Sequence, residues 1–288
     1  MDLPELFAER GFSRVFVLDG AACGIPEPAL ILAAMPYAAE AVPAAEDAWI
    51  HPYYPVSQRA YRAARELAEM VPGLALRPDI RVKPIFARLG ELTQGRNTLS
   101  YLPETGSRFH VQIFTLDRSL PPNAALLPAP KPLHCGSCRR CMEVCPAGAI
   151  TEEGFVRERC LRFWQLSGKP APEALRPLMG NRLIGCDDCQ RCCPHNTAPR
   201  ADAAPAFPLE RLLASPGEAA ADLAGQIGAN LALPNRLLTQ ACLIAANTAR
   251  TDLLPCLARL REHPSAAVAE SAAWAVEALR RGMGPEEG

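Results

Sequence analysis

Two cysteine-rich stretches decide the organisation of this chain: Cys135-Gly-Ser-Cys138-Arg-Arg-Cys141-Met-Glu-Val-Cys145-Pro146 and Cys186-Asp-Asp-Cys189-Gln-Arg-Cys192-Cys193-Pro194. In both stretches, cysteines separated by two residues let a loop fold around one corner of a [4Fe–4S] cubane. Three sulfurs from one short segment then reach three irons, and a more distant cysteine before a proline serves the fourth iron. The spacing predicts two [4Fe–4S] clusters at the centre of the chain.

The number of thiolates fixes which cysteines are expected as ligands. Two cubanes need eight, and the first stretch supplies four. The second supplies three if Cys193, before Pro194, is its last ligand and Cys192 is left over. Cys160, which lies between the stretches, then completes the set. The predicted ligands are Cys135, Cys138, Cys141 and Cys193 for one cluster, and Cys145, Cys160, Cys186 and Cys189 for the other.

Two other readings of the cysteines are weaker. A zinc site usually spaces its CxxC pairs by about 15–20 residues, whereas Cys138 and Cys186 are 48 positions apart (186 minus 138). A disulfide scaffold suits a small secreted chain, but this chain has 288 residues and an acidic start, unlike a signal peptide. The three other cysteines are expected as small core residues: Cys23, Cys242 and Cys256.

The composition indicates a soluble protein of more than one domain. Hydrophobic residues make up 49% of the chain, and the net charge of −1 gives no overall attraction to nucleic acid. The longest apolar run, residues 29–39, is interrupted by Pro36 and is too short to cross a bilayer. Twelve cysteines in such a chain predict a reducing, cytoplasmic location and no membrane partner.

The chain is predicted to be α+β, in three segments. Residues 1–125 contain β-like runs at Arg14–Leu18 and Leu30–Met35 and a helical pattern at Ser57–Val71, which predicts an α/β-type domain. The proline-rich stretch Leu120–Pro132 predicts an extended linker. Residues 126–204 then form the ferredoxin-like cluster domain, in which Ala147–Ile150, after a proline, is expected to begin a helix.

Residues 205–288 are rich in Ala and Leu and are predicted to be helical. Asn235 is expected to cap one helix and Asp252 a second, with Pro255 in the first turn of the latter. A last helix carries apolar residues from Val268 to Leu279. Short paired helices suggest a HEAT-like unit, or else a generic helical cap. With fewer than three repeats, the segment is expected to dock on the cluster domain.

The residues around the cysteines resemble one family. The segments His134–Ile150 and Ile184–Asn196, together with Arg159-Cys160, are similar to the double-cluster domain of epoxyqueuosine reductases, and a helical HEAT-like tail follows in the same order. The N-terminal part is shorter and more divergent. Within it, Met35-Pro36-Tyr37 and Gly95–Leu99 resemble pieces of the family's substrate domain.

The resemblance implies an oxidoreductase that passes single electrons through two clusters to a cobalamin or a substrate in the N-terminal domain. The reaction would remove the epoxide oxygen of epoxyqueuosine in tRNA, taking up two electrons and two protons and releasing water. A cobalamin cobalt accepts single electrons, and a general acid must reach the departing oxygen. The implied partners are tRNA and an electron donor such as ferredoxin or flavodoxin.

The catalytic acid implied by the resemblance falls in an altered segment. Between Pro84 and Gly95 the chain is shorter than the family pattern, and Arg81 stands where the acid is expected. Asp79 is therefore the candidate acid, with a turn residue after Pro78 as the alternative reading. This segment is where the resemblance departs most from the family.

Four further residues are candidates for binding a cofactor. Tyr53 and Tyr54 are expected to line a corrin or substrate pocket, or to be core aromatics. Arg96 and Asn97 are expected to hold a phosphate or a corrin amide, or to cap a turn after Gly95.

Three side chains near the cluster cysteines have possible supporting roles. His134 and His195 are expected to tune a cluster through hydrogen bonds or to lie in surface turns. Trp164 is expected to pack beside the Cys160 loop.

A second class of function uses the same clusters without catalysis. In this alternative the protein is a ferredoxin-like electron carrier that docks on a partner protein through its helical tail. Corrinoid binding separates the two hypotheses, since only the reductase requires it.

Overall fold

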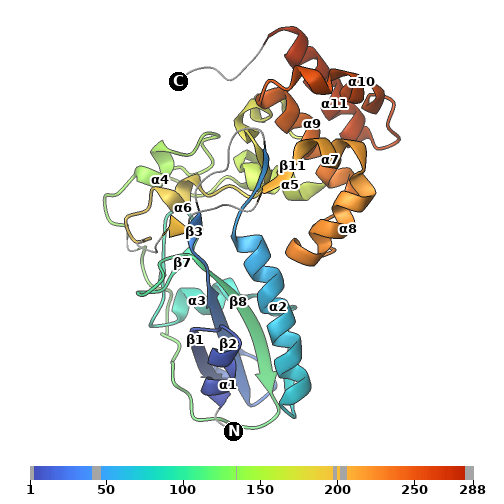
Figure 1. Cartoon of the computed structure of the whole chain (residues 1–288). Helices are drawn as coiled ribbons and strands as arrows, with labels where there is room; N and C mark the ends of the chain where they lie inside the picture. The colour runs from blue at the N-terminus through green and yellow to red at the C-terminus, as the bar shows by residue number, and fades with distance from the viewer. Residues whose placement is uncertain (1–2, 41–46, 134, 197–199, 202–205, 283–288) are drawn as a thin grey trace. The chain divides into compact units, whose positions relative to one another are not determined.

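A computed structural model describes residues 3–40, 47–133, 135–196, 200–201 and 206–282. The chain gathers into two compact units, and both draw on distant parts of the sequence (Figure 1). The first unit consists of Met1–Ala39, Pro55–Cys141 and Cys189–Pro199. The second consists of Glu40–Tyr54, Met142–Asp188 and Arg200–Gly288. The segment expected as one cluster domain, residues 126–204, is thus divided between the two units.

The first unit is built on a four-stranded antiparallel sheet of order β1-β2-β8-β5. Its central strand β2 is apolar throughout and almost completely buried, which is typical of a strand covered on both faces. The two strands expected from the sequence correspond to β1 and β2. The strands are β1 (Arg14–Asp19), β2 (Ala29–Pro36), β5 (Leu74–Leu76) and β8 (Phe109–Leu116).

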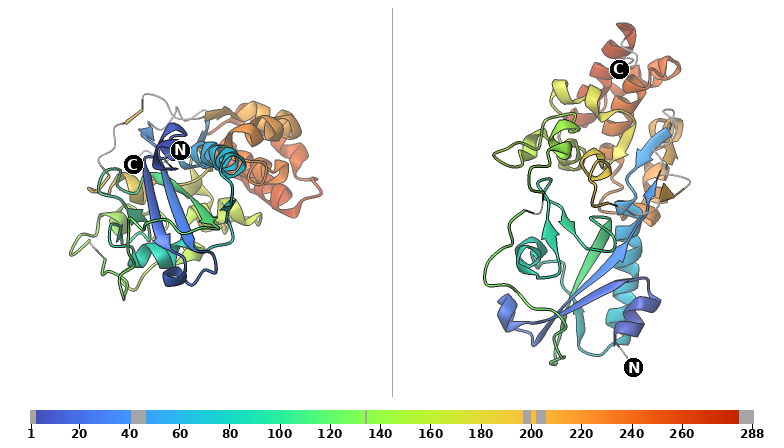
Figure 2. Two further views of the ribbon diagram at one scale, coloured as in Figure 1. Left: turned by 90° about the horizontal axis from the view of Figure 1, so that it is seen from below. Right: turned by 90° about the vertical axis from the view of Figure 1, so that its left-hand side faces the viewer.

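The two faces of this sheet bury different sets of side chains, because successive residues of a strand point to opposite sides. Leu30 and Leu32 pack with helix α3 (Val82–Arg88) in one core. The other face meets α1 (Leu3–Glu9), whose Phe7 ring lies 5.2 Å from that of Phe114. Helix α2 (Tyr53–Met70) also lies along the sheet (Figure 2), and the expected helix at Ser57–Val71 falls within it almost entirely.

The remaining parts of the first unit are a hairpin, the proline-rich stretch and several short helices. A short hairpin joins β6 (Thr93–Gln94) to β7 (Ser100–Tyr101). The proline-rich stretch is extended, as its sequence predicts, and it packs along the first unit: Leu127 N–H donates to the Arg88 carbonyl at 2.7 Å. The short helices α4 (Arg140–Glu143) and α6 (Asp188–Arg191) carry cysteines, and both cross a unit boundary. Helix η1 (Ala21–Cys23) lies between β1 and β2 in the sequence.

The second unit combines a small sheet with helices. Its strands follow the order β11-β4-β9, with β11 antiparallel and β9 parallel to β4. These strands are β4 (Asp47–Ile50), β9 (Arg182–Ile184) and β11 (Ala206–Pro208). The shortest elements are β3 (Ala39–Glu40), β10 (Arg200–Ala201), η2 (Arg157–Arg159), η3 (Glu173–Leu175), η4 (Pro177–Met179) and η5 (Thr251–Leu253).

The helices of this unit pack around α9, which is buried on nearly every side from Leu237 to Ala246. A helix apolar all round needs neighbours on all faces, and α7, α8 and α11 supply them. The helical tail is therefore confirmed. The helices are α5 (Leu161–Ser167), α7 (Leu209–Ala214), α8 (Pro216–Ile227), α9 (Pro234–Asn247), α10 (Leu254–Leu260) and α11 (Ala266–Arg280).

Three local expectations about helices are wrong. No helix follows Pro146: Gly148 adopts a left-handed φ of 57°, and its N–H closes a turn on the Cys145 carbonyl at 3.0 Å. Asn235 caps no helix, because α9 begins one residue earlier at Pro234. Asp252 forms an ion pair with Arg250 instead of capping α10. Pro255 does lie in the first turn of α10, as expected.

No helix among the described residues is long and apolar enough to span a membrane.

Candidate iron–sulfur site

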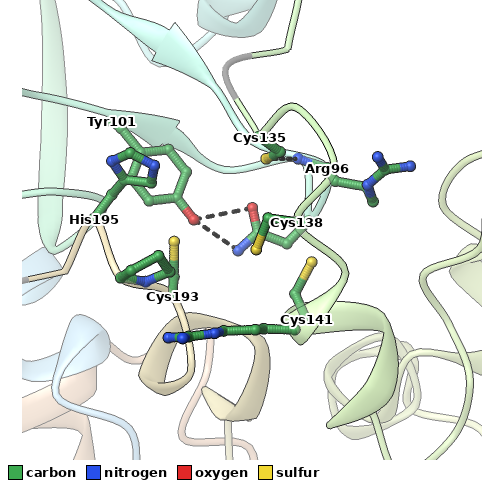
Figure 3. A pocket seen from close by; sticks show the side chains of 10 residues that line it. Arg96, Tyr101, Cys135, Cys138, Cys141, Cys193 and His195 are labelled. Carbon is green, nitrogen blue, oxygen red and sulfur yellow. Dashed lines mark hydrogen bonds between the residues drawn. The ribbon is translucent and has the colours of Figure 1, made fainter.

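Four cysteines from two distant segments line one pocket in the first unit. Figure 3 shows the sulfurs of Cys135, Cys138, Cys141 and Cys193 facing a common space. They are the four residues predicted to hold one cluster. The other lining residues are Arg96, Asn97, Tyr101, Arg140, Pro194 and His195.

The loop that carries three of these cysteines is shaped by its own backbone. The Cys138 N–H donates to the Cys135 carbonyl at 2.9 Å, and Gly136 between them has a φ of 53°. This left-handed residue tightens the turn, which glycine allows without a steric penalty. The sequence Cys-Gly-Ser-Cys therefore folds the first two sulfurs to one side of the loop, and α4 then presents Cys141.

The β6–β7 hairpin contributes a backbone donor to the sulfurs. Its loop is closed by Gly95 N–H on the Leu99 carbonyl and by Thr98 N–H on the Gly95 carbonyl, both at 2.9 Å. In this loop the Arg96 N–H points to Cys135 Sγ at 3.3 Å. Hydrogen bonds to cluster sulfurs are one of the factors that set a cluster's potential. Arg96 thus faces the sulfurs through its main chain.

Asn97 and Tyr101 of the same hairpin form a buried pair beside the pocket. They are 5% and 4% exposed, and Asn97 Nδ2 donates to the Tyr101 hydroxyl at 2.8 Å. Burial, followed by a hydrogen bond with Cys193, raises the pKa of the Tyr101 hydroxyl above its ordinary value. The His195 ring packs edge-on against the Tyr101 ring at 6.1 Å between centroids. Sequence reasoning missed Tyr101, because the hairpin that brings it to the pocket is defined only by the fold.

A polar network holds the second cysteine segment against the sheet domain of the first unit. Buried Gln190 donates from Nε2 to the Tyr37 hydroxyl and to Ser107, each at 3.0 Å. Asn196 accepts the Ser107 N–H at 2.7 Å and donates to the Gln190 carbonyl at 2.6 Å. Gly106 is required here, since a Cβ would lie 2.2 Å from Asn196 Oδ1. These bonds fix the turn that carries Cys193.

The second predicted set lies mostly in the second unit. Cys186 packs against one small core, together with Leu161, which follows Cys160, and Ala147, two residues after Cys145. The Ala149 N–H donates to Cys145 Sγ at 3.3 Å. Trp164 joins this core, as expected, and its Nε1 donates to the Glu158 carbonyl at 2.7 Å. The fourth predicted ligand, Cys189, belongs to the first unit.

Two arginines stand near the cysteines of this second set. Arg182 interacts electrostatically with Cys186 and holds Asp188 through a two-pronged pair, with both N···O distances at 2.9 Å. Burial, followed by Asp188, raises the pKa of the Cys186 thiol to about 12, against the opposing effect of Arg182. Arg162 interacts electrostatically with Cys160, and its Nε donates to the Tyr54 hydroxyl at 2.9 Å.

Cys192 has a partner outside the pocket. Its Sγ donates to the Cys189 carbonyl at 3.6 Å, and it is absent from the pocket lining. Burial, and after it the neighbouring Cys141, raise the pKa of the Cys192 thiol to about 11. A thiol that donates to a carbonyl and does not line the pocket is consistent with the prediction that Cys192 is left over.

The candidate acid lies at the surface. Asp79 is in an exposed turn, and its carboxylate pairs with Arg77 at 2.9 Å through two nitrogens. The hydrogen bonds from Arg77 lower the pKa of Asp79. An acid must carry its proton when the substrate arrives, and this pairing favours the ionised form.

The four candidate cofactor residues are divided between the two units. Tyr53 and Tyr54 are in the second unit, where Tyr54 is 2% exposed in the main helical core and Tyr53 packs against it. Arg96 and Asn97 line the four-cysteine pocket, and neither tyrosine does. His134 lies outside the described residues. Two of the four residues predicted for a corrinoid thus line the four-cysteine pocket, and we derive no step through a corrinoid.

The four-cysteine pocket does fit a cluster. Its donors are cysteine sulfurs, the ligands of iron–sulfur cubanes, and none of them is in a disulfide. The Arg96 backbone N–H points at the Cys135 sulfur, and the Tyr101 hydroxyl interacts with Cys193, as in a site for anionic thiolates. In the described part of the chain, no three His, Cys, Asp or Glu side chains are gathered around a single-ion site.

This fold and pocket define an iron–sulfur protein, and comparison with known proteins agrees. Residues 134–196 match the family of 4Fe-4S double cluster binding domains. The chain therefore has a domain for two [4Fe–4S] clusters.

Relatives of known sequence point to one kind of enzyme. The epoxyqueuosine reductase of Alicycliphilus denitrificans is 42% identical over 129 residues, 43% of this chain and 34% of that protein. That of Escherichia coli K12 is 38% identical over 143 residues, 46% of this chain and 36% of that protein. The chain thus spans about a third of the length of these relatives.

Solved structures extend the likeness to the whole fold. The epoxyqueuosine reductase of Streptococcus thermophilus has a TM-score of 0.73 at 19% identity, covering 99% of this chain and 90% of its own. An epoxyqueuosine reductase with an epoxyqueuosine-modified tRNA-Tyr stem loop has the same TM-score and identity, covering 96% of this chain and 88% of its own. The predicted resemblance to epoxyqueuosine reductases is confirmed, and the mixed α/β fold is theirs.

Proposed function

We propose that the protein is an iron–sulfur oxidoreductase of the epoxyqueuosine reductase type that acts in the queuosine modification of tRNA. The observation that carries the proposal is the four-cysteine pocket, which the β6–β7 hairpin supplies with hydrogen-bond donors. The relatives and the fold neighbours named as epoxyqueuosine reductases support it.

The proposal includes four cysteine ligands for each of the two clusters. Cys135, Cys138, Cys141 and Cys193 hold the first cluster. The second cluster takes Cys145, Cys160, Cys186 and Cys189, as the sequence predicts. When bound, each cubane accepts and passes on one electron at a time. The protein orients the thiolates and limits the access of water to them, and a ferredoxin or flavodoxin supplies the electrons.

The proposed substrate is tRNA that contains epoxyqueuosine. Its support is the fold neighbour solved with a modified tRNA-Tyr stem loop. Removal of the epoxide oxygen requires two electrons and two protons and releases water. Cobalamin binding stays a prediction that rests on the resemblance to epoxyqueuosine reductases.

The direct test is anaerobic turnover. Reconstituted protein, a chemical reductant and epoxyqueuosine-containing tRNA-Tyr are incubated with and without cobalamin, and the nucleosides are quantified by mass spectrometry. We expect queuosine to appear, and to depend on the clusters but not on Cys23, so Cys23→Ala serves as the control. Cluster-loaded protein that forms no queuosine under either condition would refute the reductase proposal.

One observation favours the electron carrier as the second candidate. Asp79, the candidate acid, is exposed and paired with Arg77. Electron relay through two clusters needs no general acid, whereas removal of the epoxide oxygen does. The carrier predicts rapid reduction of an acceptor protein and no corrinoid binding, which an anaerobic titration with hydroxocobalamin measures.

A further inference from the structure

The Tyr101 hydroxyl lies among three polar neighbours at the edge of the four-cysteine pocket. They are the Asn97 amide, the Ser107 hydroxyl and Cys193. Figure 3 shows Tyr101 together with Cys193. A phenol has one hydrogen to donate and lone pairs to accept with. The question is which of these neighbours receives that hydrogen when Cys193 is a metal-bound thiolate.

The orientation of the Asn97 amide is fixed by two backbone groups. Nδ2 donates to the Cys189 carbonyl at 3.1 Å, and Oδ1 accepts the Leu99 N–H at 3.3 Å. If the amide were rotated by 180°, Nδ2 would face the Leu99 N–H and Oδ1 would face the Cys189 carbonyl, and both hydrogen bonds would be lost. The second hydrogen of Nδ2 is then donated to the Tyr101 oxygen at 2.8 Å. The phenol oxygen is thus an acceptor toward Asn97.

The phenol hydrogen therefore has three possible acceptors. Asn97 Oδ1, at 3.1 Å, is already engaged by Leu99, and it belongs to the amide that donates to the same phenol. Ser107 Oγ already accepts from Gln190 Nε2 at 3.0 Å. Cys193 as a cluster ligand carries negative charge, and hydrogen bonds to a charged acceptor are the strong ones.

We propose that Tyr101 donates its hydroxyl hydrogen to the sulfur of Cys193 and so raises the reduction potential of the cluster in this pocket. A donor to a ligand sulfur stabilises the reduced, more negative cluster more than the oxidised one. The inference rests on the proposed assignment of Cys193 to that cluster. Tyr101 is a positioning and tuning residue, since it acts through the ligand.

The hairpin is built to hold this donor. Gly95 has no room for a side chain, because a Cβ there would lie 2.6 Å from Asn97 Oδ1 and 2.7 Å from Tyr101 Cε2. The Tyr101 ring is 4% exposed and is braced by the His195 ring. A buried hydrogen bond has little competition from water, which makes its effect on the cluster larger.

The test is a redox titration of Tyr101→Phe, followed by electron paramagnetic resonance in the anaerobic, fully loaded protein. Phenylalanine keeps the ring and removes only the hydroxyl. We expect unchanged iron content, a fall of about 59 mV in one of the two midpoints, and no change in the other. That shift is about a tenfold change in the reduced-to-oxidised ratio of a one-electron couple. The hyperfine coupling of one exchangeable proton to the reduced cluster should disappear as well.

Two further variants separate the outcomes. Tyr61→Phe removes an exposed phenol elsewhere in the first unit and should leave both midpoints in place. Ser107→Ala removes one competing acceptor together with two hydrogen bonds of the network at the Cys193 turn, so its iron content is measured first. In the fully loaded variant the proton coupling should stay intact if Cys193 is the acceptor. A Tyr101→Phe protein with full iron, both wild-type midpoints and an unchanged proton coupling would overturn the inference. Loss of iron from Cys193→Ala, measured separately, tests the ligand assignment on which the inference rests.

Discussion

The four-cysteine pocket of the first unit and the cysteines of the second unit have different surroundings. In the first unit, two uncharged groups interact with the cysteines, namely the Arg96 N–H and the Tyr101 hydroxyl, while Arg96 and Arg140 also line the pocket. In the second unit, arginine side chains stand near Cys160 and Cys186. A neutral hydrogen bond acts only at contact, whereas a charge acts over several ångströms and is screened by salt. The two clusters should therefore respond to different substitutions.

The largest expected effect concerns the second set of ligands. Cys160→Ala should lose about four of the roughly eight irons that two cubanes hold, because no other predicted ligand replaces it. Cys256→Ala, which alters a thiol in the helical core, is the matched control and should keep all of them. Iron and sulfide analysis per chain provides the measurement. Full iron in Cys160→Ala would remove this residue from the ligand set.

A methyl group in the hairpin should disturb only the first cluster. Gly95→Ala forces the Asn97 and Tyr101 side chains to move, and such overpacking costs about 1–3 kcal/mol. We expect a lower free energy of unfolding and a lower midpoint for one cluster. Gly217→Ala, in α8, adds a methyl where nothing lies within 4 Å and should change neither. A shift of both midpoints in Gly95→Ala would contradict the separation of the two sites.

The charge of Arg182 near Cys186 should change the reduction potential of the second cluster. Arg182→Gln leaves the Asp188 carboxylate without its partner, so the midpoint potential of the second cluster should fall. Loss of this partly exposed pair should also lower the free energy of unfolding by about 1 kcal/mol. Asp188→Asn should shift the same midpoint upward. Added salt should reduce both shifts, which redox titrations at two ionic strengths measure. Equal shifts of the two clusters would show that the arginine does not act locally.

The smallest expected effect is on acid stability in the first unit. Burial lowers the pKa of His110, in β8, from 6.5 to about 4. The unfolded chain therefore binds this proton first, so the stabilisation is complete above about pH 6.5 and is lost as the pH falls toward 4. His110→Gln should reduce the change in the free energy of unfolding with pH, between about pH 4 and 6.5, by up to about 1.4 kcal/mol per pH unit. Urea denaturation at several pH values checks this; an unchanged slope would contradict it.

The sequence predicts the elements whose periodicity is strong. Strands β1 and β2, helix α2 and the last helix α11 fall where apolar spacing places them, because burial on one face dictates that spacing. The first residue of a helix is harder to predict, since a side chain that could cap the helix can pair with another group instead. Asp252 pairs with Arg250, and the Ala149 N–H goes to a sulfur after Pro146 instead of beginning a helix.

The cysteine spacing predicts the chemistry of the site but not its supporting groups. Cys135 and Cys193 are 58 positions apart (193 minus 135), and the ferredoxin pattern still brings them together. Tyr101 has no motif of its own, and its role follows from a hairpin whose register only the fold defines. For the same reason, the sequence could not show that Tyr54 is buried in a helical core of the second unit.

The adjacent pair Cys192 and Cys193 gives the most direct test of the account, because the two thiols differ by one position and are assigned opposite roles. Iron content and the electron paramagnetic resonance spectrum of the reduced protein should be compared in Cys192→Ala and Cys193→Ala, prepared anaerobically in parallel. The account predicts that Cys192→Ala keeps both clusters and that Cys193→Ala loses the cluster of the four-cysteine pocket. Loss of a cluster in Cys192→Ala with full retention in Cys193→Ala would contradict it.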